Sequence, residues 1–356
     1  MVRSILKGMQ VVTQLPDAAA PPPRVAIALG TFDGVHVGHQ TVLRSARQAA
    51  QQHGLASAVW TFANHPHSVV SATAPKQLTT LQERLALMAA MGFEVAYVIP
   101  FDETVRQIDP ETFLTEWLWA RCGVRHISVG YDFCFGRNRA GNSALLRQWG
   151  QTQGVGISVL PALALHCQGT EQVVSSTLIR KLVAYGQVAE AAERLGRPYT
   201  LTAPVVRGFQ RGRQLGFPTA NLDMALLVHH HRVLPALGVY AGWATVEGWD
   251  RPVMAVANLG LSPTFETVEP AERLEIHLLD VLEPLTGETL YGKTLSFAFA
   301  HHLREERWFP SKEALVAQIT ADCDHARARL VQAPPPPLQW VSCPSSEGML
   351  CSATKA

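Results

Sequence analysis

The chain has few charged residues, and charges of one sign are not grouped. Charged residues make up 17% of the 356 residues, and the formal net charge at pH 7 is +1. A protein that binds duplex nucleic acid carries dense clusters of lysine and arginine, and this sequence has none. The composition therefore favours small-molecule substrates and predicts no nucleic-acid partner.

Paired cysteines and long apolar runs are also missing. The six cysteines are scattered and form no Cys-x-x-Cys pair, and the N-terminus lacks the basic and then apolar order of a signal peptide. No apolar run reaches the ~20 residues that a membrane helix needs. We expect a soluble cytoplasmic protein with no membrane partner, while its oligomeric state is not predicted by the sequence.

Apolar residues, by contrast, are abundant enough for two cores. They make up 47% of the chain, and a length of 356 residues is typical of two domains. Changes in composition and periodicity predict an N-terminal extension over residues 1–23, a first domain over 24–186 and a second over 187–332. The proline-rich residues 333–356 are predicted to be a disordered tail.

Residues 30–39 join an apolar strand to a helix. Residues 25–29 form a continuous apolar run, as in a buried parallel strand, and residues 41–53 have helical periodicity. The first turn of a helix points unpaired N–H groups and the positive end of the helix dipole at the preceding loop. The segment is therefore a candidate anion site.

Two histidines stand at this candidate site. His36 and His39 are three residues apart, so a helix starting at His36 would turn both imidazoles toward one anion, and Gly38 would let a nucleotide approach the backbone. Histidines without a nucleophilic serine or cysteine suit nucleotidyl transfer, in which positioning and charge stabilisation dominate. An ordinary turn is one alternative, and a zinc site, which would need a third ligand, is another.

The string His36-Val37-Gly38-His39 is the HxGH signature of the nucleotidylyltransferase superfamily, and residues 30–39 as a whole closely resemble the bacterial riboflavin kinase/FMN adenylyltransferases, or FAD synthetases. The resemblance implies that His36 and His39 are catalytic. It also implies ATP contacts in the same segment, from Gly30, Phe32, Asp33 and Gly38.

Strands alternate with helices over the rest of the first domain. Apolar strand patterns lie at 57–62, 95–99, 126–130 and 157–160, with helical patterns at 81–91 and 110–120. This alternation predicts a mostly parallel, doubly wound α/β sheet, and the resemblance implies its Rossmann-like form.

Two loops of this domain resemble flavin-binding loops of the family. Residues 61–66 match a TFxxHP segment at the end of a strand, and residues 131–141 resemble a GxDFxFG…AG loop. The flavin ligands implied by the resemblance are Asn64, His65, Asp132 and Phe135. The alternatives are a turn before proline and an ordinary surface loop.

Hydroxyl groups open the last helix of the first domain. Residues 174–180 read Val-Ser-Ser-Thr-Leu-Ile-Arg, and hydroxyls at a helix start are most often simple caps. Matched to the second phosphate motif of the superfamily, the implied triphosphate ligands are Ser175, Ser176, Thr177 and Arg180.

The periodicity changes in the second domain. Short strands separated by turn signals replace helical patterns at 199–206, 238–246, 253–259, 275–279 and 294–299, followed by a helix over 312–330. This spacing predicts a small antiparallel β-barrel with one terminal helix.

The candidate chemistry of the second domain lies in residues 212–222. Thr219 and Asn221 are two apart, so on an extended segment their side-chain oxygens face one way and suit Mg²⁺ brought by ATP. Phe217 to Asn221 spell FPTAN, the riboflavin kinase signature, and in the family a glutamate matching Glu275 activates the ribityl hydroxyl. The further ATP and riboflavin contacts that the resemblance implies are Gly212, Gly216, Phe217 and Pro218.

The sequence thus predicts an enzyme with two activities. The second domain would phosphorylate riboflavin with ATP to FMN, and the first would transfer an adenylyl group from ATP to FMN, giving FAD and pyrophosphate. One alternative is a single-activity nucleotidylyltransferase, against which the set of Thr219, Asn221 and Glu275 argues. The other is a flavin-binding protein, which would not need both His36 and His39.

Overall fold

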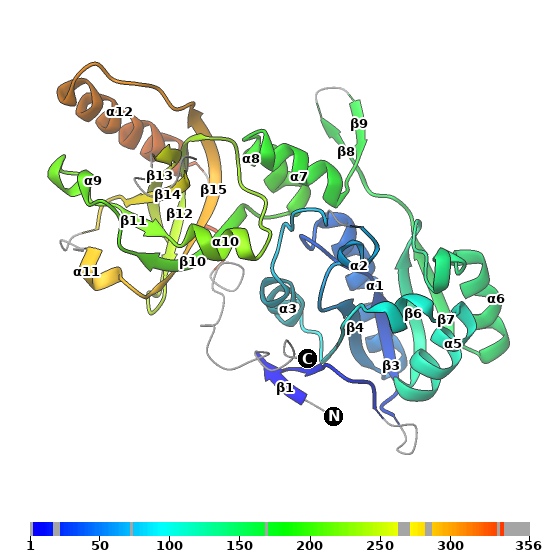
Figure 1. The fold of residues 1–356 in the computed structure, drawn as a ribbon. Coiled ribbons are helices and arrows are strands. Elements are labelled where there is room, and N and C mark those ends of the chain that lie inside the picture. Colours follow the sequence, from blue (N-terminus) through cyan, green and yellow to red (C-terminus); the bar gives the residue numbers. More distant parts are fainter. Residues whose placement is uncertain are drawn as a thin grey trace. The chain divides into compact units, whose positions relative to one another are not determined.

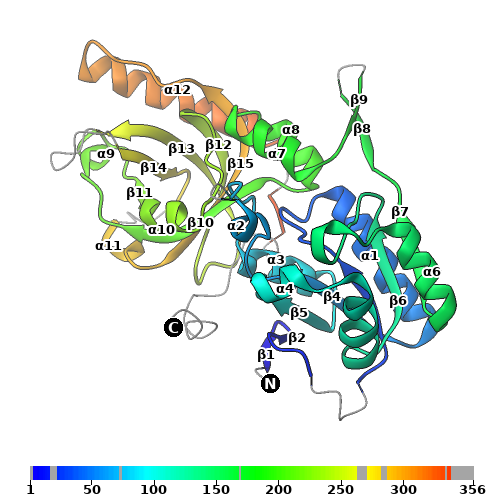
Figure 2. The same ribbon diagram turned by 45° about the vertical axis from the view of Figure 1, so that its right-hand side comes forward.

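The structure is a computed structural model that describes residues 3–16, 22–71, 74–167, 170–262, 271–281, 287–332 and 335–337. The chain divides into two compact units (Figures 1 and 2). The described residues of Met1–Pro75 and Thr79–Ser175 form the first unit, and Lys76–Leu78 together with the described residues from Ser176 onward form the second.

The first unit is built on a seven-stranded sheet in the order β1-β2-β5-β4-β3-β6-β7. All neighbours from β2 to β7 pair in parallel, and β1 pairs antiparallel with β2. All five residues of the central strand β3 are buried, as its continuous apolar run predicts. The strands are β1 Arg3–Leu6, β2 Met9–Val12, β3 Val25–Leu29, β4 Ala56–Phe62, β5 Val95–Ile99, β6 Val124–Gly130 and β7 Gly156–Leu160.

Helices pack against this sheet, and α1 contacts the strands β3, β4 and β6 (Figure 1). The helices are α1 Val37–His53, α2 His67–Val70, α3 Leu81–Ala90, α4 Glu103–Gln107, α5 Pro110–Thr112, the π-helix η1 Phe113–Arg121, the 3₁₀ turn η2 Arg137–Arg139 and α6 Ser143–Gln153. The predicted doubly wound sheet is confirmed.

Several elements of this unit differ from the sequence prediction. Strands β1 and β2 lie within residues 1–23, which were predicted to be an extension outside the first domain. They belong to the sheet because β2 pairs with the distant β5. The predicted helix at 110–120 becomes largely π-helical where Phe113 and Trp117 both pack on Trp60. An unpredicted hairpin, β8 Ala164–Cys167 and β9 Thr170–Val173, stands clear of the sheet in both views, and β9 is exposed throughout, so no apolar alternation marks it.

The second unit is a closed antiparallel barrel in the order β10-β11-β14-β13-β12-β15, as the sequence predicts. Its strands are β10 Tyr199–Val206, β11 Ala220–Leu222, β12 Gly238–Val246, β13 Val253–Ser262, β14 Ala271–Leu278 and β15 Thr294–Arg304. Its helices are α7 Ser176–Ala184, α8 Val188–Leu195, α9 Arg211–Gln214, α10 Met224–His229, α11 Gly287–Leu290 and α12 Lys312–Leu330.

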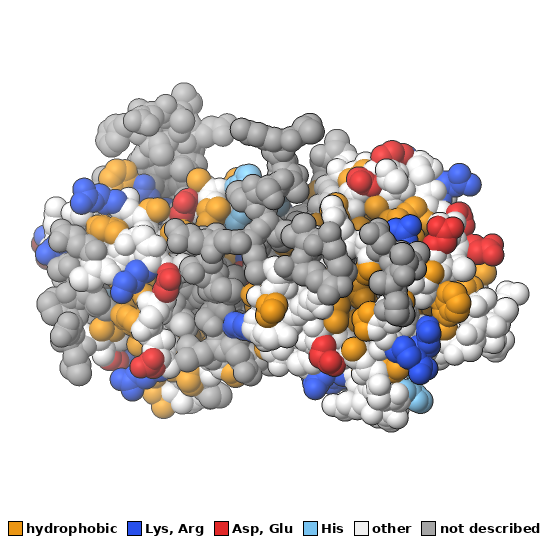
Figure 3. Space-filling model, turned by 90° about the horizontal axis from the view of Figure 1, so that it is seen from below, with side chains coloured by type: hydrophobic (Ala, Val, Ile, Leu, Met, Phe, Trp, Pro, Cys, Tyr) orange, Lys and Arg blue, Asp and Glu red, His pale blue; other side chains and the backbone are white. Residues whose placement is uncertain are grey.

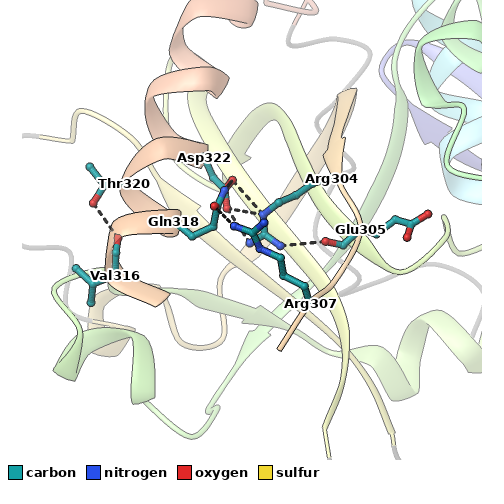
Figure 4. A network of polar contacts seen from close by, with 7 residues as sticks. All are labelled: Arg304, Glu305, Arg307, Val316, Gln318, Thr320 and Asp322. Atoms are coloured by element: carbon teal, nitrogen blue, oxygen red, sulfur yellow. Dashed lines mark hydrogen bonds and ion pairs between the residues drawn. The ribbon is translucent and has the colours of Figure 1, made fainter. Parts of the chain in front are cut away.

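The long helix α12 lies along the outside of the barrel (Figure 1). Its buried residues Cys323, Ala326 and Leu330 pack against outward-facing residues of β12, β13 and β15. Figure 4 shows the polar fastening: Arg304 at the end of β15 donates to both carboxylate oxygens of Asp322 at 2.8–3.1 Å, and Gln318 donates to the same carboxylate at 2.7 Å. The terminal helix is thus fixed to the barrel wall.

The compact units divide between Ser175 and Ser176, whereas the predicted domain boundary follows residue 186. The predicted tail, residues 333–356, lies outside the described residues except for 335–337. Among the helices of the described residues, none has both the length and the apolar character needed to cross a membrane. On the face drawn in Figure 3, side chains of both charge signs are interspersed with hydrophobic ones.

Candidate active sites

The loop between β3 and α1 has an unusual backbone. Phe32 and Val35 have φ angles of +52° and +42°, in the left-handed region that non-glycine residues rarely adopt, and Gly34 between them has a φ of +83°. A β-branched residue such as Val35 is strained there, at about 1–3 kcal/mol. Such conformations persist only where surrounding contacts enforce them, so contacts from other parts of the chain must hold this loop.

One set of contacts comes from Thr79. The Asp33 carboxylate accepts hydrogen bonds from the backbone N–H of Thr79 at 3.1 Å and from its hydroxyl at 3.2 Å. The same hydroxyl accepts from the N–H of Gly34 at 2.9 Å. Asp33 is 2% exposed, so this predicted ATP ligand is buried and holds the turn at Gly34.

A second set comes from Arg84 of α3. Its guanidinium donates to the carbonyl of Thr31 at 2.6 Å, and the hydroxyl of Thr61 donates to the same carbonyl at 3.1 Å. Arg84 is 4% exposed; burial lowers the pKa of the guanidinium, and the nearby Asp33 carboxylate opposes that shift. A buried cation therefore fastens the loop to α3.

The two histidines meet at the start of α1. His36 is the N-cap residue, and its Nδ1 accepts from the backbone N–H of His39 at 3.2 Å. The two rings are stacked with centroids 3.5 Å apart, and Phe32 meets the His39 ring edge-on at 5.4 Å. The predicted arrangement, both imidazoles on one side of the first turn, is present.

The glycines of this segment leave room for close packing. A β-carbon on Gly30 would lie 2.9 Å from the Phe32 ring, and one on Gly38 would lie 3.2 Å from the His36 ring. The same β-carbon on Gly38 would lie 3.9 Å from Cβ of Leu163, whose carbonyl accepts from the N–H of Val174 at 2.8 Å. The chain therefore reaches Ser175 from a point beside the start of α1.

The remaining predicted triphosphate ligands belong to the second unit. Ser176 is the first residue of α7, Thr177 follows it, and Arg180 lies one turn further along. The Arg180 Nε donates to the carbonyl of Lys76 at 2.7 Å. The division between the units thus falls inside the predicted Ser-Ser-Thr motif.

The predicted flavin ligands have different surroundings. Asn64, after β4, exchanges hydrogen bonds with the backbone of Phe101, accepting at 2.8 Å and donating at 2.9 Å, so its amide links the ends of two strands. His65 accepts through Nδ1 from the N–H of His67 at 3.2 Å. Both are partly exposed at the carboxyl end of the parallel sheet, where open α/β sheets bind ligands.

Asp132 and Phe135 differ in exposure. Asp132 is exposed in the loop after β6. Phe135 is 7% exposed and belongs to the hydrophobic core. Its ring stacks on that of Phe133 with centroids 5.6 Å apart and packs at a tilt against that of Phe113 at 5.7 Å. Its backbone pairs with Gly141 in both directions, which closes the loop. In this structure Phe135 anchors the loop from beneath.

In the second unit, three polar residues form a row across neighbouring strands. Asn221 of β11 pairs with Glu275 of β14, and Glu275 pairs on its other side with Asn258 of β13. Leu274 and Ile276 beside Glu275 are fully buried inside the barrel, so the alternation of the strand turns Glu275 outward. Directly paired residues share a face, and the row therefore lies on the outer wall.

The FPTAN segment borders this row. The N–H of Phe217 donates to the carbonyl of Gly212 at 2.8 Å, and a β-carbon on Gly212 would lie 2.4 Å from the Phe217 carbonyl and 3.3 Å from the Thr219 hydroxyl. Gly216 has a φ of +87°, which the turn before Phe217 requires. These glycines bring the loop onto Thr219.

His277 fixes the other side of the segment. Its Nδ1 lies 2.8 Å from the carbonyl of Pro218, and its ring meets Phe217 edge-on at 5.5 Å. Burial lowers the pKa of His277, so the ring is neutral at neutral pH and donates through Nδ1–H to that carbonyl.

Asn221 has the features of a ligand to a hard cation. The residue is 6% exposed, and its Oδ1 is buried without a hydrogen-bond donor among the described residues. Gly208 lies against the amide: a β-carbon there would be 2.4 Å from Nδ2. A buried acceptor that lacks a donor is costly unless a ligand satisfies it, and amide and hydroxyl oxygens suit Mg²⁺. The residues present therefore fit the predicted cation.

Three neighbours of this row were not predicted from the sequence. Asn258 pairs with Glu275 across the sheet, and Arg273 precedes Glu275 by two residues and so shares its face. Glu306, after β15, lies against Gly260, where a β-carbon would meet its carboxylate. The i−2 spacing could have identified Arg273, whereas Asn258 and Glu306 join the row only through strand pairing and loop packing.

Within the described residues, no group of three or more His, Cys, Asp and Glu side chains is arranged to hold a metal ion. Asn221 and Thr219 are not among those residue types, so this finding does not bear on the cation site predicted at the FPTAN segment.

Comparisons with known proteins identify the family of the chain. A family model described as FAD synthetase matches residues 19–178, and one described as riboflavin kinase matches residues 195–330. The bifunctional riboflavin kinase/FMN adenylyltransferase of Haemophilus influenzae is 33% identical over 321 residues, covering 90% of this chain and 99% of the relative. That of Pseudomonas fluorescens is 35% identical over 321 residues, covering 90% and 97%.

A solved structure is similar over nearly the same length. The crystal structure described as a macrolide-efflux protein from Streptococcus pneumoniae has a TM-score of 0.75 and 26% identity, and the match covers 89% of this chain and 98% of that one. The resemblance inferred from the HxGH and FPTAN motifs is confirmed by the family models and relatives. The chain belongs to the family of bifunctional riboflavin kinase/FMN adenylyltransferases.

Proposed function

We propose that the two activities of the family reside at the two sites described above. On the barrel, the terminal hydroxyl of the riboflavin ribityl chain takes the γ-phosphoryl group of ATP, giving FMN and ADP. At the loop between β3 and α1, a phosphate oxygen of FMN attacks the α-phosphorus of a second ATP, giving FAD and pyrophosphate.

We assign adenylyl transfer to the loop between β3 and α1 because His36 and His39 form a stacked pair there. The first turn of α1 points backbone N–H groups, those of Val37 and Gly38 among them, and the positive end of the helix dipole at the loop, and the imidazoles stand beside them. These groups stabilise the charge that develops on the transferring phosphate and on the departing pyrophosphate. The hydrogen bond from Gly34 to Thr79 and the helical turn that contains Gly38 hold these groups in place.

Other residues of the adenylyl-transfer site are assigned by position. Gly30, Phe32, Asp33 and Gly38 shape the loop that receives ATP, with Asp33 acting through the Gly34 turn. The hydroxyls and guanidinium of the Ser-Ser-Thr helix start contact the triphosphate, through Ser175, Ser176, Thr177 and Arg180. The flavin side is formed by Asn64, His65 and Asp132, with Phe135 supporting the loop from the core.

We assign riboflavin phosphorylation to the barrel because Asn221, Glu275 and Asn258 form a row of polar side chains on its outer wall. The Glu275 carboxylate accepts the proton of the ribityl hydroxyl as the new O–P bond forms. Thr219 and Asn221 would hold Mg²⁺, which supplies charge neutralisation to the phosphates of ATP when it is bound. Gly212, Gly216, Phe217 and Pro218 shape the loop that covers the nucleotide and flavin.

Both steps use ATP, which supports the predicted cytoplasmic location. The decisive assay incubates the full chain with riboflavin, ATP and Mg²⁺ and separates FMN and FAD by chromatography. We expect FMN to appear first and FAD to follow. If FAD forms only when FMN is added, the protein is a single-activity nucleotidylyltransferase. If flavin binds but no product forms, it is a flavin-binding protein.

A further inference from the structure

A short segment after β10 lies beside the Asn221–Glu275 row and is held by an aromatic contact. The ring of Phe209 lies beneath the guanidinium of Arg273, whose central carbon is 4.1 Å from the ring centroid. Arg273 lies on β14, two residues before Glu275 and on the same outward face. Among the described residues, no carboxylate forms an ion pair with Arg273, so the ring is the contact that orients it.

The same segment has a second attachment at Tyr291. The amide of Gln210 donates to the Tyr291 hydroxyl at 3.2 Å, and the guanidinium of Arg207 lies 5.6 Å from the centroid of the Tyr291 ring. Residues 207–210 are therefore held on two sides, by Arg273 and by Tyr291.

Between these attachments, Gly208 presses on Asn221. A β-carbon on Gly208 would lie 2.4 Å from Nδ2 and 2.7 Å from Oδ1 of the Asn221 amide. The backbone of the segment thus covers the buried amide whose Oδ1 has no donor among the described residues. Any loosening of the segment would expose this amide to water and allow it to rotate.

We propose that Arg273 is a positioning residue of the kinase site: by stacking on Phe209 it keeps Gly208 against Asn221 and so holds the Oδ1 ready for the cation of Mg–ATP. Arg273 acts through the segment and needs no contact with either substrate. The inference rests on the proposed kinase site for its functional consequence, while the stack and its effect on the segment stand apart from it.

The first test is hydrogen exchange of the full chain without ligands. A partly exposed cation–π contact is worth about 0.5–1 kcal/mol, a factor of about two to five. We expect amide exchange within residues 207–216 to quicken about two- to fivefold in Arg273→Met and in Phe209→Leu. The matched control is Arg125→Met, because Arg125 also stacks on an aromatic ring, Trp119, but in the first unit.

The second test is kinetic. We expect Arg273→Met to raise the KM for Mg–ATP and the Mg²⁺ concentration for half-maximal rate by about two- to fivefold, with kcat changed less than about twofold. Arg273→Lys, which keeps a cation over the ring, should restore part of the effect. A double variant of Phe209→Leu and Arg273→Met should be no worse than the more severe single variant, because both remove the same contact.

Two results would overturn the proposal. One is unchanged exchange in residues 207–216 in both single variants; the other is a double variant whose KM change equals the product of the two single changes. If the unaltered chain fails to phosphorylate riboflavin, the proposed function is at fault, and the exchange experiment still decides whether Arg273 holds the segment.

Discussion

The stacked imidazoles of His36 and His39 make the most specific prediction at the scale of single residues. Replacing either by alanine should lower FAD formation from supplied FMN by about 10²–10³, the typical loss for one preorganised contact to a developing charge. Riboflavin phosphorylation should stay nearly normal. The measurement is the rate of each step, assayed separately.

His53→Ala is a suitable control, because His53 lies in the last turn of the same helix. His36→Ala also removes an N-cap, at about 1 kcal/mol, so its thermal stability should be recorded alongside. Equal loss of both activities would indicate a folding defect and would contradict the assignment of His36 and His39 to the adenylyl step.

Glu275 is the residue assigned as the base of the kinase step. Glu275→Gln keeps the shape and hydrogen-bonding capacity of the side chain but removes its basicity, so riboflavin phosphorylation should fall by about 10²–10⁴. ATP binding and FAD synthesis from FMN should be little changed. Glu272→Gln, an exposed carboxylate on the same strand, serves as the control. Near-normal phosphorylation by a folded Glu275→Gln protein would refute the assignment.

At the scale of elements, His126 joins three parts of the first unit. It lies on β6, its Nε2 is 3.0 Å from the Ser158 hydroxyl of β7, and its ring faces His53 at the end of α1 with centroids 6.4 Å apart. Burial, and then the charge of His53, lower its pKa below the ordinary value of 6.5. The folded state therefore favours the neutral ring.

The sign of the pH effect follows from this shift. The unfolded chain takes up the proton near pH 6.5 and the folded protein only at lower pH, so the contribution to stability is complete above that pH and is lost as the pH falls. His126→Gln should reduce the drop in melting temperature between about pH 7.5 and 5.5. His67→Gln, at an exposed position, should leave it unchanged; an unaltered drop in His126→Gln would contradict the argument.

At the scale of the whole molecule, the second unit should fold and work alone. Its barrel and α12 have their own core, and independent cores are what makes a domain separable. We expect a fragment of residues 176–332 to phosphorylate riboflavin without forming FAD. The measurement is FMN production by the fragment, compared with a fragment of residues 187–332 that lacks α7.

The fragment should also be less stable than the same unit in the full chain. Arg232 is 2% exposed and donates to the carbonyls of Leu78 and Thr200 at 2.9 and 2.8 Å, and the fragment lacks Leu78. Loss of one acceptor of a buried guanidinium costs about 1–3 kcal/mol. A fragment that is folded but as stable as the intact unit would argue against this contact, and absence of any folded fragment would argue against separate cores.

Local pattern was enough for the main elements of both units. The buried run of β3, the helix after His36 and the longer strands of the barrel follow from periodicity, because the side chains that face a core repeat at the period of the element. The three-residue strand β11, Ala220–Leu222, is too short to show a period and was not predicted. The HxGH and FPTAN motifs were enough to identify the family, because they combine the residue types and spacings that the chemistry needs. Elements without an apolar pattern, such as β8 and β9, or with only a distant partner, such as β2, were missed.

The sequence by itself determined which chemical groups the chain carries and the elements on which they lie. Only the tertiary structure decided what surrounds them. Asp33 is buried against Thr79, Phe135 joins the core, and Asn258 and Arg273 come beside Glu275 and Asn221. These neighbours are set by strand register and loop packing between residues far apart in the chain, and such contacts leave no local periodicity to be read.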